Sequence, residues 1–186
     1  MCGLLGMLAA TGDVDKYVDA LERSLPCMRH RGPDAAGTWH DGDAAFGFNR
    51  LSIIDLEHSH QPLRWGPEDQ PDRYAMTFNG EIYNYVELRE ELKGLGYTFH
   101  TEGDGEPIVV GYHHWGKDVV NHLRGMFGIV IWDTHTKTMF AARDQFGIKP
   151  LYYATTDAGT VFASEMKCIL EMADEIGLES VSYTHL

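Results

Sequence analysis

The cysteine at the second position is the residue whose type and place most directly indicate chemistry. If Met1 is removed, as a small second residue permits, Cys2 carries both a thiol and a free α-amine. A free thiol has a pKa of about 8.5 and an α-amine one of about 7.7 to 8.0, so at neutral pH part of the amine can accept the thiol proton. The thiolate could then attack an amide or ester carbonyl and form a thioester. The alternative is that Cys2 is only an early strand residue.

Three further stretches place polar groups where a catalytic site could use them. Asn79-Gly80 follows a predicted strand and could donate a carboxamide and an N–H to a developing oxyanion, or could be an ordinary Asn-Gly turn. Arg50 ends another predicted strand and could bind a carboxylate through two hydrogen bonds, or could be a surface or ion-pair residue. Asp104, in an acidic loop flanked by glycines, could bind an ammonium group or cap the next helix.

Two other polar stretches carry weaker signals. The segment 29–34, Arg-His-Arg-Gly-Pro-Asp, is typical of a loop, which either faces an anion or an active site or is a solvated turn. His58 and His60 are weak evidence for a metal site, and the ten histidines show no His-x-x-x-His spacing with a carboxylate partner. We therefore expect no bound metal.

The hydrophobic periodicity predicts the elements that must hold these side chains. Helices are predicted at 14–28, with an end or kink at Pro26, and at 86–93, 107–115, 118–123 and 166–172, the last capped by Ser164-Glu165. Strands are predicted at 4–9, 44–51, 73–78, 97–101, 126–133, 138–143, 151–154 and 160–163. The last four strands resemble one antiparallel meander, and residues 58–72 are predicted to be a long loop.

Composition narrows the class of protein. A length of 186 residues fits one globular domain, although the tail after about residue 177 shows no pattern. The net charge of −13 argues against a nucleic-acid or anionic-membrane partner. The three cysteines are widely spaced without a C-x-x-C pair, which indicates neither a disulfide framework nor a zinc site, so we expect a cytoplasmic protein. The first apolar run is too short for a secretory or membrane segment.

A series of ordered motifs resembles the glutaminase domain of the glutamine-hydrolysing asparagine synthetases, which are class II glutamine amidotransferases with an N-terminal nucleophile. The resemblance runs from Cys2 to about Leu170. Its motifs are Cys2-Gly3, RHRGPD at 29–34, RLSIID at 50–55, QPL at 61–63, NGEIYN at 79–84, RDQFGIKPLYY at 143–153 and FASEMK at 162–167. Glucosamine-phosphate synthase and phosphoribosyl amidotransferase domains share the nucleophile and an Asn-Gly pair but generally lack the other signatures.

This resemblance implies a fold of class α+β, the four-layer αββα sandwich of N-terminal nucleophile hydrolases, with two largely antiparallel sheets. It implies that Cys2 attacks the glutamine side-chain amide, that its own amine is the general base, and that Asn79 and Gly80 form the oxyanion hole. The substrate would be held through its α-carboxylate by Arg50, through its α-ammonium by Glu81 and Asp104, and along the backbone around Ile53 and Ile54.

One loop departs from the family pattern. Residues 103–106 read Gly-Asp-Gly-Glu where such domains usually have Ser-Asp-Thr-Glu or Ser-Asp-Cys-Glu. Asp104 and Glu106 keep their places. Because glycine loses more conformational freedom on ordering, the expected consequence is weaker glutamine binding rather than lost catalysis.

The resemblance also sets expectations for cofactors and partners. Asparagine synthetases of this type carry a C-terminal synthetase domain that binds ATP and magnesium, with an SGGxDS-like phosphate loop, and no such motif occurs here. The chain is thus expected to need no cofactor, to release glutamate and ammonia, and to partner its own synthetase domain in the full-length protein; a homodimer is compatible with this. The alternatives are a non-catalytic glutamine-binding or assembly module, and the glutaminase domain of another amidotransferase in peptide or antibiotic biosynthesis.

Overall fold

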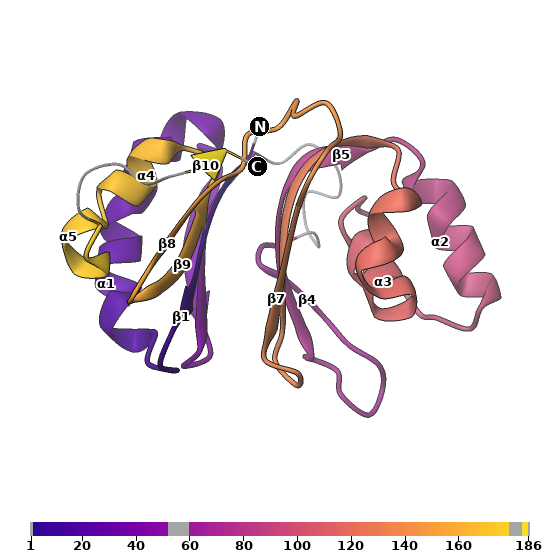
Figure 1. Cartoon of the computed structure of the whole chain (residues 1–186). Helices are drawn as coiled ribbons and strands as arrows, with labels where there is room; N and C mark the ends of the chain where they lie inside the picture. Colours follow the sequence, from indigo (N-terminus) through magenta and orange to yellow (C-terminus); the bar gives the residue numbers. More distant parts are fainter. Residues whose placement is uncertain (1, 52–59, 179–183, 186) are drawn as a thin grey trace.

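The computed structural model describes residues 2–51, 60–178 and 184–185 (Figure 1). The strands are β1 (Gly3–Ala9), β2 (Ala35–His40), β3 (Ala44–Arg50), β4 (Leu63–Trp65), β5 (Tyr74–Ile82), β6 (Gly125–Asp133), β7 (Thr138–Arg143), β8 (Tyr152–Thr156), β9 (Gly159–Ala163) and β10 (Thr184–His185). The helices are α1 (Asp15–Ser24), α2 (Tyr85–Gly94), α3 (Glu106–Trp115), α4 (Met166–Leu170) and α5 (Ala173–Ile176), with 3₁₀ helices η1 (Leu25–Arg31) and η2 (Gly116–Asn121). Within these ranges, none of the helices is long and apolar enough to cross a bilayer.

The strands form two antiparallel sheets that face each other. A six-stranded sheet has the order β10-β8-β9-β1-β3-β2, and a four-stranded sheet has the order β4-β5-β6-β7. Helices α1, α4 and α5 cover the outer face of the larger sheet, whereas α2 and α3 cover the outer face of the smaller one (Figure 1). The result is four layers in the order helix, sheet, sheet, helix, which confirms the predicted αββα class.

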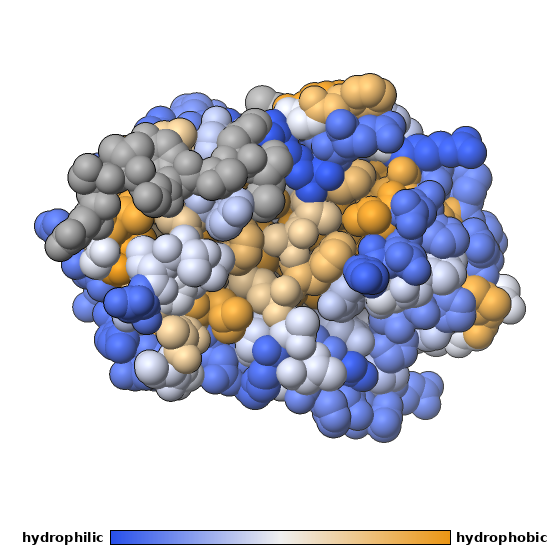
Figure 2. Space-filling model, in the orientation of Figure 1, coloured by the Kyte–Doolittle hydropathy of each residue, from blue (hydrophilic) through white to orange (hydrophobic). Residues whose placement is uncertain are grey.

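Three apolar clusters hold the layers together, and the two-residue period of the strands produces them. On β6, Ile129 and Ile131 belong to the cluster under α2 and α3, while Val130 and Trp132 belong to the cluster between the sheets. Figure 2 shows apolar atoms gathered in the band between the sheets, with hydrophilic atoms on both sides of it. Each fully buried side chain of this size contributes about 1.5–3 kcal/mol to folding.

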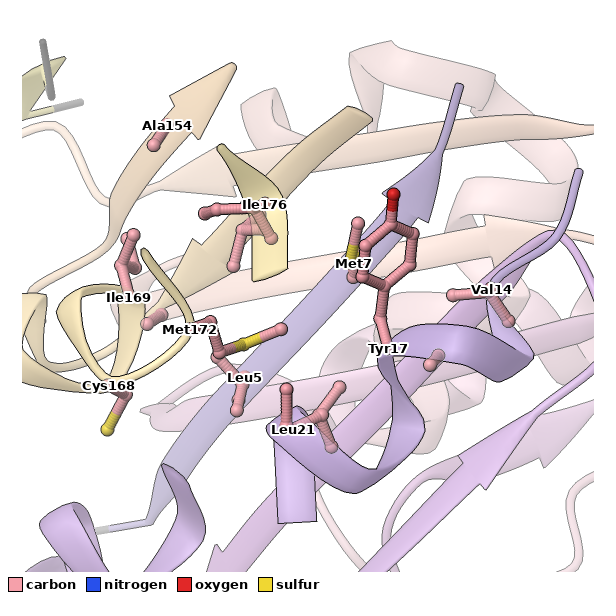
Figure 3. Packing of buried hydrophobic residues seen from close by; sticks show 14 of the residues in the cluster. Leu5, Met7, Val14, Tyr17, Leu21, Ala154, Cys168, Ile169, Met172 and Ile176 are labelled. Carbon is pink, nitrogen blue, oxygen red and sulfur yellow. The ribbon is translucent and has the colours of Figure 1, made fainter. Parts of the chain in front are cut away.

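The third cluster joins the larger sheet to its helices. Leu5 and Met7 of β1 pack toward Tyr17 and Leu21 of α1, together with Ile169 of α4 (Figure 3). Helix α1 ends at Ser24, one residue before the 3₁₀ segment that contains Pro26, in agreement with the predicted kink. The first strand is therefore fixed on its outer face by helices from both parts of the chain.

The predicted four-strand meander is wrong. Strands β6 and β7 pair in the four-stranded sheet, but β8 and β9 pair in the six-stranded one, so residues 144–151 cross from one sheet to the other. Both pairs are hairpins with the same two-residue period. Periodicity specifies the pairing inside each hairpin but not the sheet that the hairpin joins.

Several boundaries also differ from the prediction. Strands β2 and β4 were not predicted, because β2 is a largely exposed edge strand without alternation and β4 has three residues. The predicted strand at 97–101 is absent, and Tyr97 and Phe99 instead pack against the α2–α3 cluster. Ser164 does not cap α4, since its hydroxyl accepts the Leu4 N–H at 3.1 Å.

Candidate active site

A cavity of about 160 Å³ collects residues from both sheets. Its lining includes Cys2, which precedes β1, and Arg50, which ends β3. The connection from β7 to β8 crosses between the sheets at the same end of the molecule as the N-terminus (Figure 1). The lining residues are Cys2, Arg50, Leu51, His60, Gln61, Leu63, Met76, Phe78, Asn79, Gly80, Glu81, Asp104, Gly105, Met126 and Lys149. Six of the eight sequence-predicted site residues are among them. The other two, Ile53 and Ile54, lie outside the described residues.

Cys2 reaches the cavity because of the register between β1 and β3. Gly3 pairs with Asn49, so the residue before β1 lies beside the end of β3. The Leu51 N–H donates to the Cys2 sulfur at 3.4 Å, and the thiol donates to the Leu51 carbonyl at 3.6 Å. An N–H donor of this kind stabilises an anionic sulfur more than a neutral one, because hydrogen bonds to a charged acceptor are stronger. The half-buried thiol is thus held by backbone and open to the cavity.

Arg50 is the last residue of β3 and is 7% exposed, so the surface alternative is wrong for this side chain. Its backbone is fixed by the neighbouring strand, where Ala35 pairs with it and the Asp34 N–H donates to its carbonyl at 3.1 Å. The last residue of the RHRGPD segment, Asp34, therefore helps to hold the backbone of Arg50 in place. A buried guanidinium that lines a cavity is suited to bind a carboxylate through two parallel hydrogen bonds.

Asn79 lies inside β5, which continues to Ile82, so the prediction that it follows the end of a strand is wrong. Ala75 belongs to the cluster between the sheets, and the two-residue period places Asn79 on that same face, toward the sheet that holds Cys2. The side chain is 0% exposed. Within the part of the chain that the structure describes, neither its amide nitrogen nor its oxygen has a hydrogen-bond partner. An unsatisfied buried amide is costly and therefore rare, and here both polar atoms of the Asn79 amide are available to a ligand in the cavity.

Gly80 is constrained by close packing rather than by an unusual backbone angle. A Cβ at this position would lie 2.2 Å from the Met126 carbonyl oxygen and 2.8 Å from the Phe127 Cα on β6. Because both atoms belong to backbone, no side-chain movement could make room. Glycine is the residue that lets β5 and β6 stay paired here, and it leaves the cavity wall at this point without a side chain.

The acidic end of the cavity is formed by Asp104 and Glu81. The Ile82 N–H donates to Asp104 Oδ2 at 2.9 Å, whereas α3 begins without a side-chain cap, so the helix-cap alternative for Asp104 is wrong. Burial raises the pKa of Asp104 above its ordinary value; this N–H opposes the shift, and the Glu81 carboxylate adds to it. Two adjacent carboxylates, one of them desolvated, form a place where a bound cation is stabilised.

The loop 103–106 is held from outside despite its two glycines. Arg89 Nη2 donates to the Gly103 carbonyl at 2.7 Å. The Glu106 carboxylate, 1% exposed, accepts the N–H groups of His100 and Thr101 at 2.8 and 2.7 Å. These hydrogen bonds fix both ends of the loop that carries Asp104. The expected weakening of glutamine binding by the glycines stays a prediction.

The side-chain amide of Gln61 makes two hydrogen bonds with the backbone of β5, as a neighbouring strand would. Its amide nitrogen donates to the Phe78 carbonyl at 2.7 Å, and its amide oxygen accepts the Phe78 N–H at 3.1 Å. The family motif at 61–63 is thereby given a structural reason. Sequence reasoning did not assign Gln61 to the site, and His60 was weighed only as a metal ligand, although both line the cavity.

The connection between β7 and β8 is organised around one carboxylate. Asp144 accepts four backbone N–H groups at 3.0 to 3.2 Å, from Phe127, Phe146, Ile148 and Lys149. Burial alone would raise the pKa of Asp144, but these hydrogen bonds hold it below its ordinary value. The RDQFGIKP motif is thus a loop wrapped around Asp144, which carries the chain from one sheet to the other beside the cavity.

Replacing Asp144 by alanine should lower the free energy of unfolding by about 3 kcal/mol or more, because the variant leaves several N–H groups without their charged acceptor. The loss should be measured by chemical denaturation, with the exposed Asp19→Ala as the control, expected to change stability by about 0.5 kcal/mol or less. A carboxylate with a lowered pKa stabilises the fold above its unfolded pKa, near 3.9, and the contribution disappears as the pH falls through the folded value. The difference between wild type and Asp144→Ala should therefore shrink below about pH 4; a constant difference would contradict this role.

An ion-pair cluster joins two other motifs near the site. Arg31 Nε donates to Glu165 Oε1 at 2.5 Å, and His30 Nε2 lies 3.2 Å from the same oxygen. Burial would raise the pKa of Glu165, but the hydrogen bond and charge of Arg31 lower it below its ordinary value. Residues 29–31 belong to η1, so the loop prediction for 29–34 is wrong over its first half. The cluster fastens η1 to the segment before α4.

The remaining cysteines differ from Cys2 in their surroundings. Cys168 is fully buried, and burial raises its thiol pKa to about 12, so it is not a nucleophile at neutral pH. Cys27 lies in η1, packed against the α1 side of the larger sheet. Of the three, Cys2 alone lines the cavity.

Solved structures share this fold. The glutamine phosphoribosylpyrophosphate amidotransferase from Bacillus subtilis superposes with a TM-score of 0.68 over 100% of this chain and 44% of its own, at 20% identity. A structure described as the allosteric regulatory enzyme of purine biosynthesis gives a TM-score of 0.71 with the same coverage and identity. The likeness shows that the chain has the same fold as these enzymes, the αββα arrangement of four layers.

The family follows from the sequence comparison. A family model described as a glutamine amidotransferase domain matches residues 1–184. The chain therefore belongs to the glutamine amidotransferase domain family, which is a family of enzymes.

Curated relatives are longer than this chain. It is 54% identical over 191 residues to a Mycobacterium tuberculosis protein named as a proposed glutamine-hydrolysing asparagine synthetase, covering 97% of this chain and 29% of the relative. It is 42% identical over 184 residues to the glutamine-hydrolysing asparagine synthetase 1 of Bacillus subtilis, covering 96% and 28%. A protein of Gibberella zeae named amidase chry2 is 36% identical over 182 residues. The chain thus spans less than a third of the length of these relatives.

Proposed function

We propose that this chain hydrolyses glutamine to glutamate and ammonia through a thioester on Cys2. The observation that carries the proposal is that Cys2, from the larger sheet, and Asn79-Gly80, from the smaller one, line one cavity with Arg50 and Asp104. Hydrolysis of a zwitterionic amide requires a nucleophile, hydrogen-bond donors for the oxyanion, and charges of both signs to bind the amino-acid end of the substrate.

In the proposed acylation step the Cys2 thiol gives its proton to the α-amine that removal of Met1 exposes. The sulfur then forms a bond to the side-chain carbonyl carbon of glutamine, and the carbonyl oxygen takes the negative charge. The Asn79 amide and the Gly80 N–H donate to this oxyanion. When the oxyanion collapses, the carbon–nitrogen bond breaks, the amine returns its proton to the leaving nitrogen, and ammonia departs.

Deacylation repeats these roles with water. The α-amine takes a proton from the water molecule as its oxygen bonds to the thioester carbon, and the same donors stabilise the second oxyanion. The carbon–sulfur bond breaks, the sulfur regains the proton, and glutamate leaves. Each oxyanion exists only between ground states, so donors aimed at it accelerate the reaction rather than tighten glutamine binding.

Recognition of the amino-acid end rests on opposite charges. Arg50 would bind the α-carboxylate, and Asp104 with Glu81 would bind the α-ammonium, whose charge offsets the burial of Asp104. The backbone around Ile53 and Ile54 is proposed to line the same site. Leu63, Met76 and Phe78 supply apolar surface for the methylene groups of the side chain.

Arg50→Ala and Asp104→Ala should each raise the KM for glutamine with little change in kcat, because each removes a charge-assisted contact to the end that does not react. Loss of about 1.5–3 kcal/mol corresponds to a KM increase of about 10- to 150-fold. The control is Arg64→Ala, which removes an exposed arginine that pairs with Asp72. Loss of kcat alone in either site variant would contradict its assignment.

The acid dependence of KM tests the same contact. Only the ionised carboxylate of Asp104 attracts an ammonium, and its pKa is raised. The KM should therefore increase at a higher pH than an ordinary aspartate would give, as the pH falls through that raised value. This dependence should be absent from Asp104→Asn, measured as KM against pH from 4 to 8.

The ammonia that the proposed hydrolysis releases needs an acceptor. Since relatives named as asparagine synthetases are more than three times as long, we propose that the domain supplies ammonia to a synthetase domain of the full-length protein, where ATP and magnesium would bind. The relative named as an amidase keeps open a different acceptor, as in peptide or antibiotic biosynthesis. A non-catalytic glutamine-binding module is the remaining alternative, and the intact Cys2, Asn79 and Gly80 disfavour it.

The deciding experiment combines intact mass with glutamate release from glutamine on one preparation. The expected result is release of glutamate by protein whose mass lacks Met1. Protein that lacks Met1, binds glutamine and releases no glutamate would instead favour the binding module.

A further inference from the structure

Gly105 lines the Cys2 cavity without contributing a side chain, although its backbone does not require a glycine. It is the residue before α3, with φ −75° and ψ −38°, which is ordinary right-handed helical backbone. A residue with a Cβ adopts these angles without strain. The glycine is therefore not explained by a turn that only glycine can make.

The space beside Gly105 is bounded by three apolar side chains that also line the cavity. A Cβ at this position would lie 3.6 Å from Leu63 Cδ1, 3.6 Å from Met76 Cε and 3.7 Å from Phe78 Cδ1, all of them ordinary van der Waals distances. Gly80 differs, because a Cβ there would lie 2.2 Å from a backbone oxygen. Gly105 therefore leaves room for one methyl group at the apolar wall of the cavity, whereas Gly80 leaves none.

The position of this room along a bound ligand follows from its neighbours. Asp104, the preceding residue, is fixed by the Ile82 N–H and is proposed to bind an α-ammonium. Leu63, Met76 and Phe78 carry no charge. A ligand held by Asp104 at one end and attacked by Cys2 at the other has its carbon chain between those two points. The carbon chain, and not a charged group, therefore faces the apolar wall.

Either the protein or the ligand can supply a methyl group to this room, but not both. Empty apolar space forfeits the dispersion contacts that a methyl group would make. Filling it corresponds to about a fourfold gain in affinity. Two methyl groups in the same place would overfill it, which is also unfavourable. The loop does not readily move aside, because Arg89 and Glu106 fix both its ends.

We propose that Gly105 sets the substrate selectivity of the cavity, which binds glutamine with one extra methyl group on its carbon chain at least as tightly as glutamine itself. The class of ligand is an α-amino acid with a side-chain amide and a branched carbon chain. The proposal rests on the proposed glutamine hydrolysis for the reaction, and the extra methyl group changes no bond that forms or breaks. Substitution of Gly105 should therefore change KM and not kcat.

The test compares Gly105→Ala with Gly94→Ala. Gly94 is the last residue of α2, and a Cβ there would meet nothing within 4 Å, so this control replaces a glycine without changing the cavity. Calorimetry measures the binding of L-glutamine and of its 3-methyl and 4-methyl derivatives, each as single stereoisomers. Each variant is made in a Cys2→Ala background to prevent turnover.

In the protein with Gly105, at least one methylated ligand should bind with a Kd no higher than that of glutamine. Gly105→Ala should bind glutamine about fourfold more tightly and that methylated ligand about tenfold or more weakly. Gly94→Ala should leave every Kd within about twofold of its original value. With Cys2 present, Gly105→Ala should lower the KM for glutamine about fourfold, with kcat within about twofold.

The outcomes distinguish this proposal from the proposed reaction. The expected change of selectivity in a protein that binds glutamine but releases no glutamate would support the role of Gly105 and contradict glutamine hydrolysis. Normal glutamate release, with the same ratio of Kd values in Gly105→Ala as in Gly94→Ala, would overturn the role of Gly105 alone. Weaker binding of every methylated ligand than of glutamine by the protein with Gly105 would overturn that role even if Gly105→Ala does not fold. Absence of binding of all the ligands would overturn both proposals.

Discussion

Glutamate release from glutamine is expected to fall to background in Cys2→Ala, while the thermal unfolding temperature changes little. The sulfur is the atom that bonds to the substrate carbon, and alanine offers no substitute for it. The cost to the fold is small, because Cys2 is half-buried and outside the three apolar clusters, and its hydrogen bonds within the described residues are those to the Leu51 backbone. Activity is measured by coupled detection of glutamate, and stability by scanning calorimetry.

Cys27→Ala is the matched control for the loss of a thiol. Cys27 is also half-buried and free, but it lies in η1 and does not line the cavity. Its replacement should leave glutamate release unchanged. A preparation whose mass shows that Met1 is retained should be as inactive as Cys2→Ala, because its amine is in a peptide bond. Full turnover in that preparation would rule out the α-amine as the base.

Asn79→Ala should lower kcat by about 10² to 10³ with little change in KM, the effect of removing a single oxyanion donor. The side chain is fully buried and, among the described residues, has no partner, so the ligand-free fold does not depend on its hydrogen bonds. Single-turnover assays should show slower thioester formation, since the same donor acts on the intermediate before the thioester and on the one after it.

Thr77→Val separates this effect from a general response to changes inside β5. Thr77 lies two residues earlier on the same face, is 0% exposed, and has a hydroxyl without a partner in the described part of the chain. Valine keeps its shape, so stability should be equal or higher and kcat should be unchanged. A loss of kcat in Thr77→Val comparable to that in Asn79→Ala, or wild-type acylation in Asn79→Ala, would remove Asn79 from the oxyanion hole.

The sequence predicts those parts of the fold that local patterns control. The two-residue period locates β1, β3 and β6 to β9, and the three- and four-residue spacing locates α1 and α3. It does not reveal that β8 and β9 join the sheet of β1, because that choice depends on apolar faces distant in sequence. Edge strand β2 has no apolar alternation, so its pairing with β3 could not be predicted.

The candidate site was also only partly predictable from local sequence patterns. Arg50, Asn79 and Asp104 were each ambiguous alone, and their convergence depends on the register of β1 with β3 and of β5 with β6. Motif resemblance selected them correctly as cavity residues, while their roles stay predictions. Lys149 belongs to the RDQFGIKPLYY motif but was given no role, since a lysine in a turn is normally exposed, and only the structure of the loop around Asp144 shows that it is buried.

The position of β1 in the larger sheet has a consequence for the order of folding. Strands β4 to β7 of the smaller sheet come from one continuous stretch of chain, 63–143, and can pair as soon as that stretch is made. β1 pairs with β3 on one side but with β9 on the other, where Leu5 meets Ala163. Pairing of segments so distant in sequence is slow, because a long loop must close before the contacts form.

During synthesis, which proceeds from the N-terminus, β1 can pair with β3 early, but its other edge stays unpaired until β9, almost the whole domain later, has left the ribosome. The smaller sheet, with Asn79 and Gly80, can be complete first, and the larger sheet is completed last. The first residues of the chain consequently stay outside a finished sheet for most of synthesis. That interval is the time available for an aminopeptidase to remove Met1, before folding places Cys2 in the cavity.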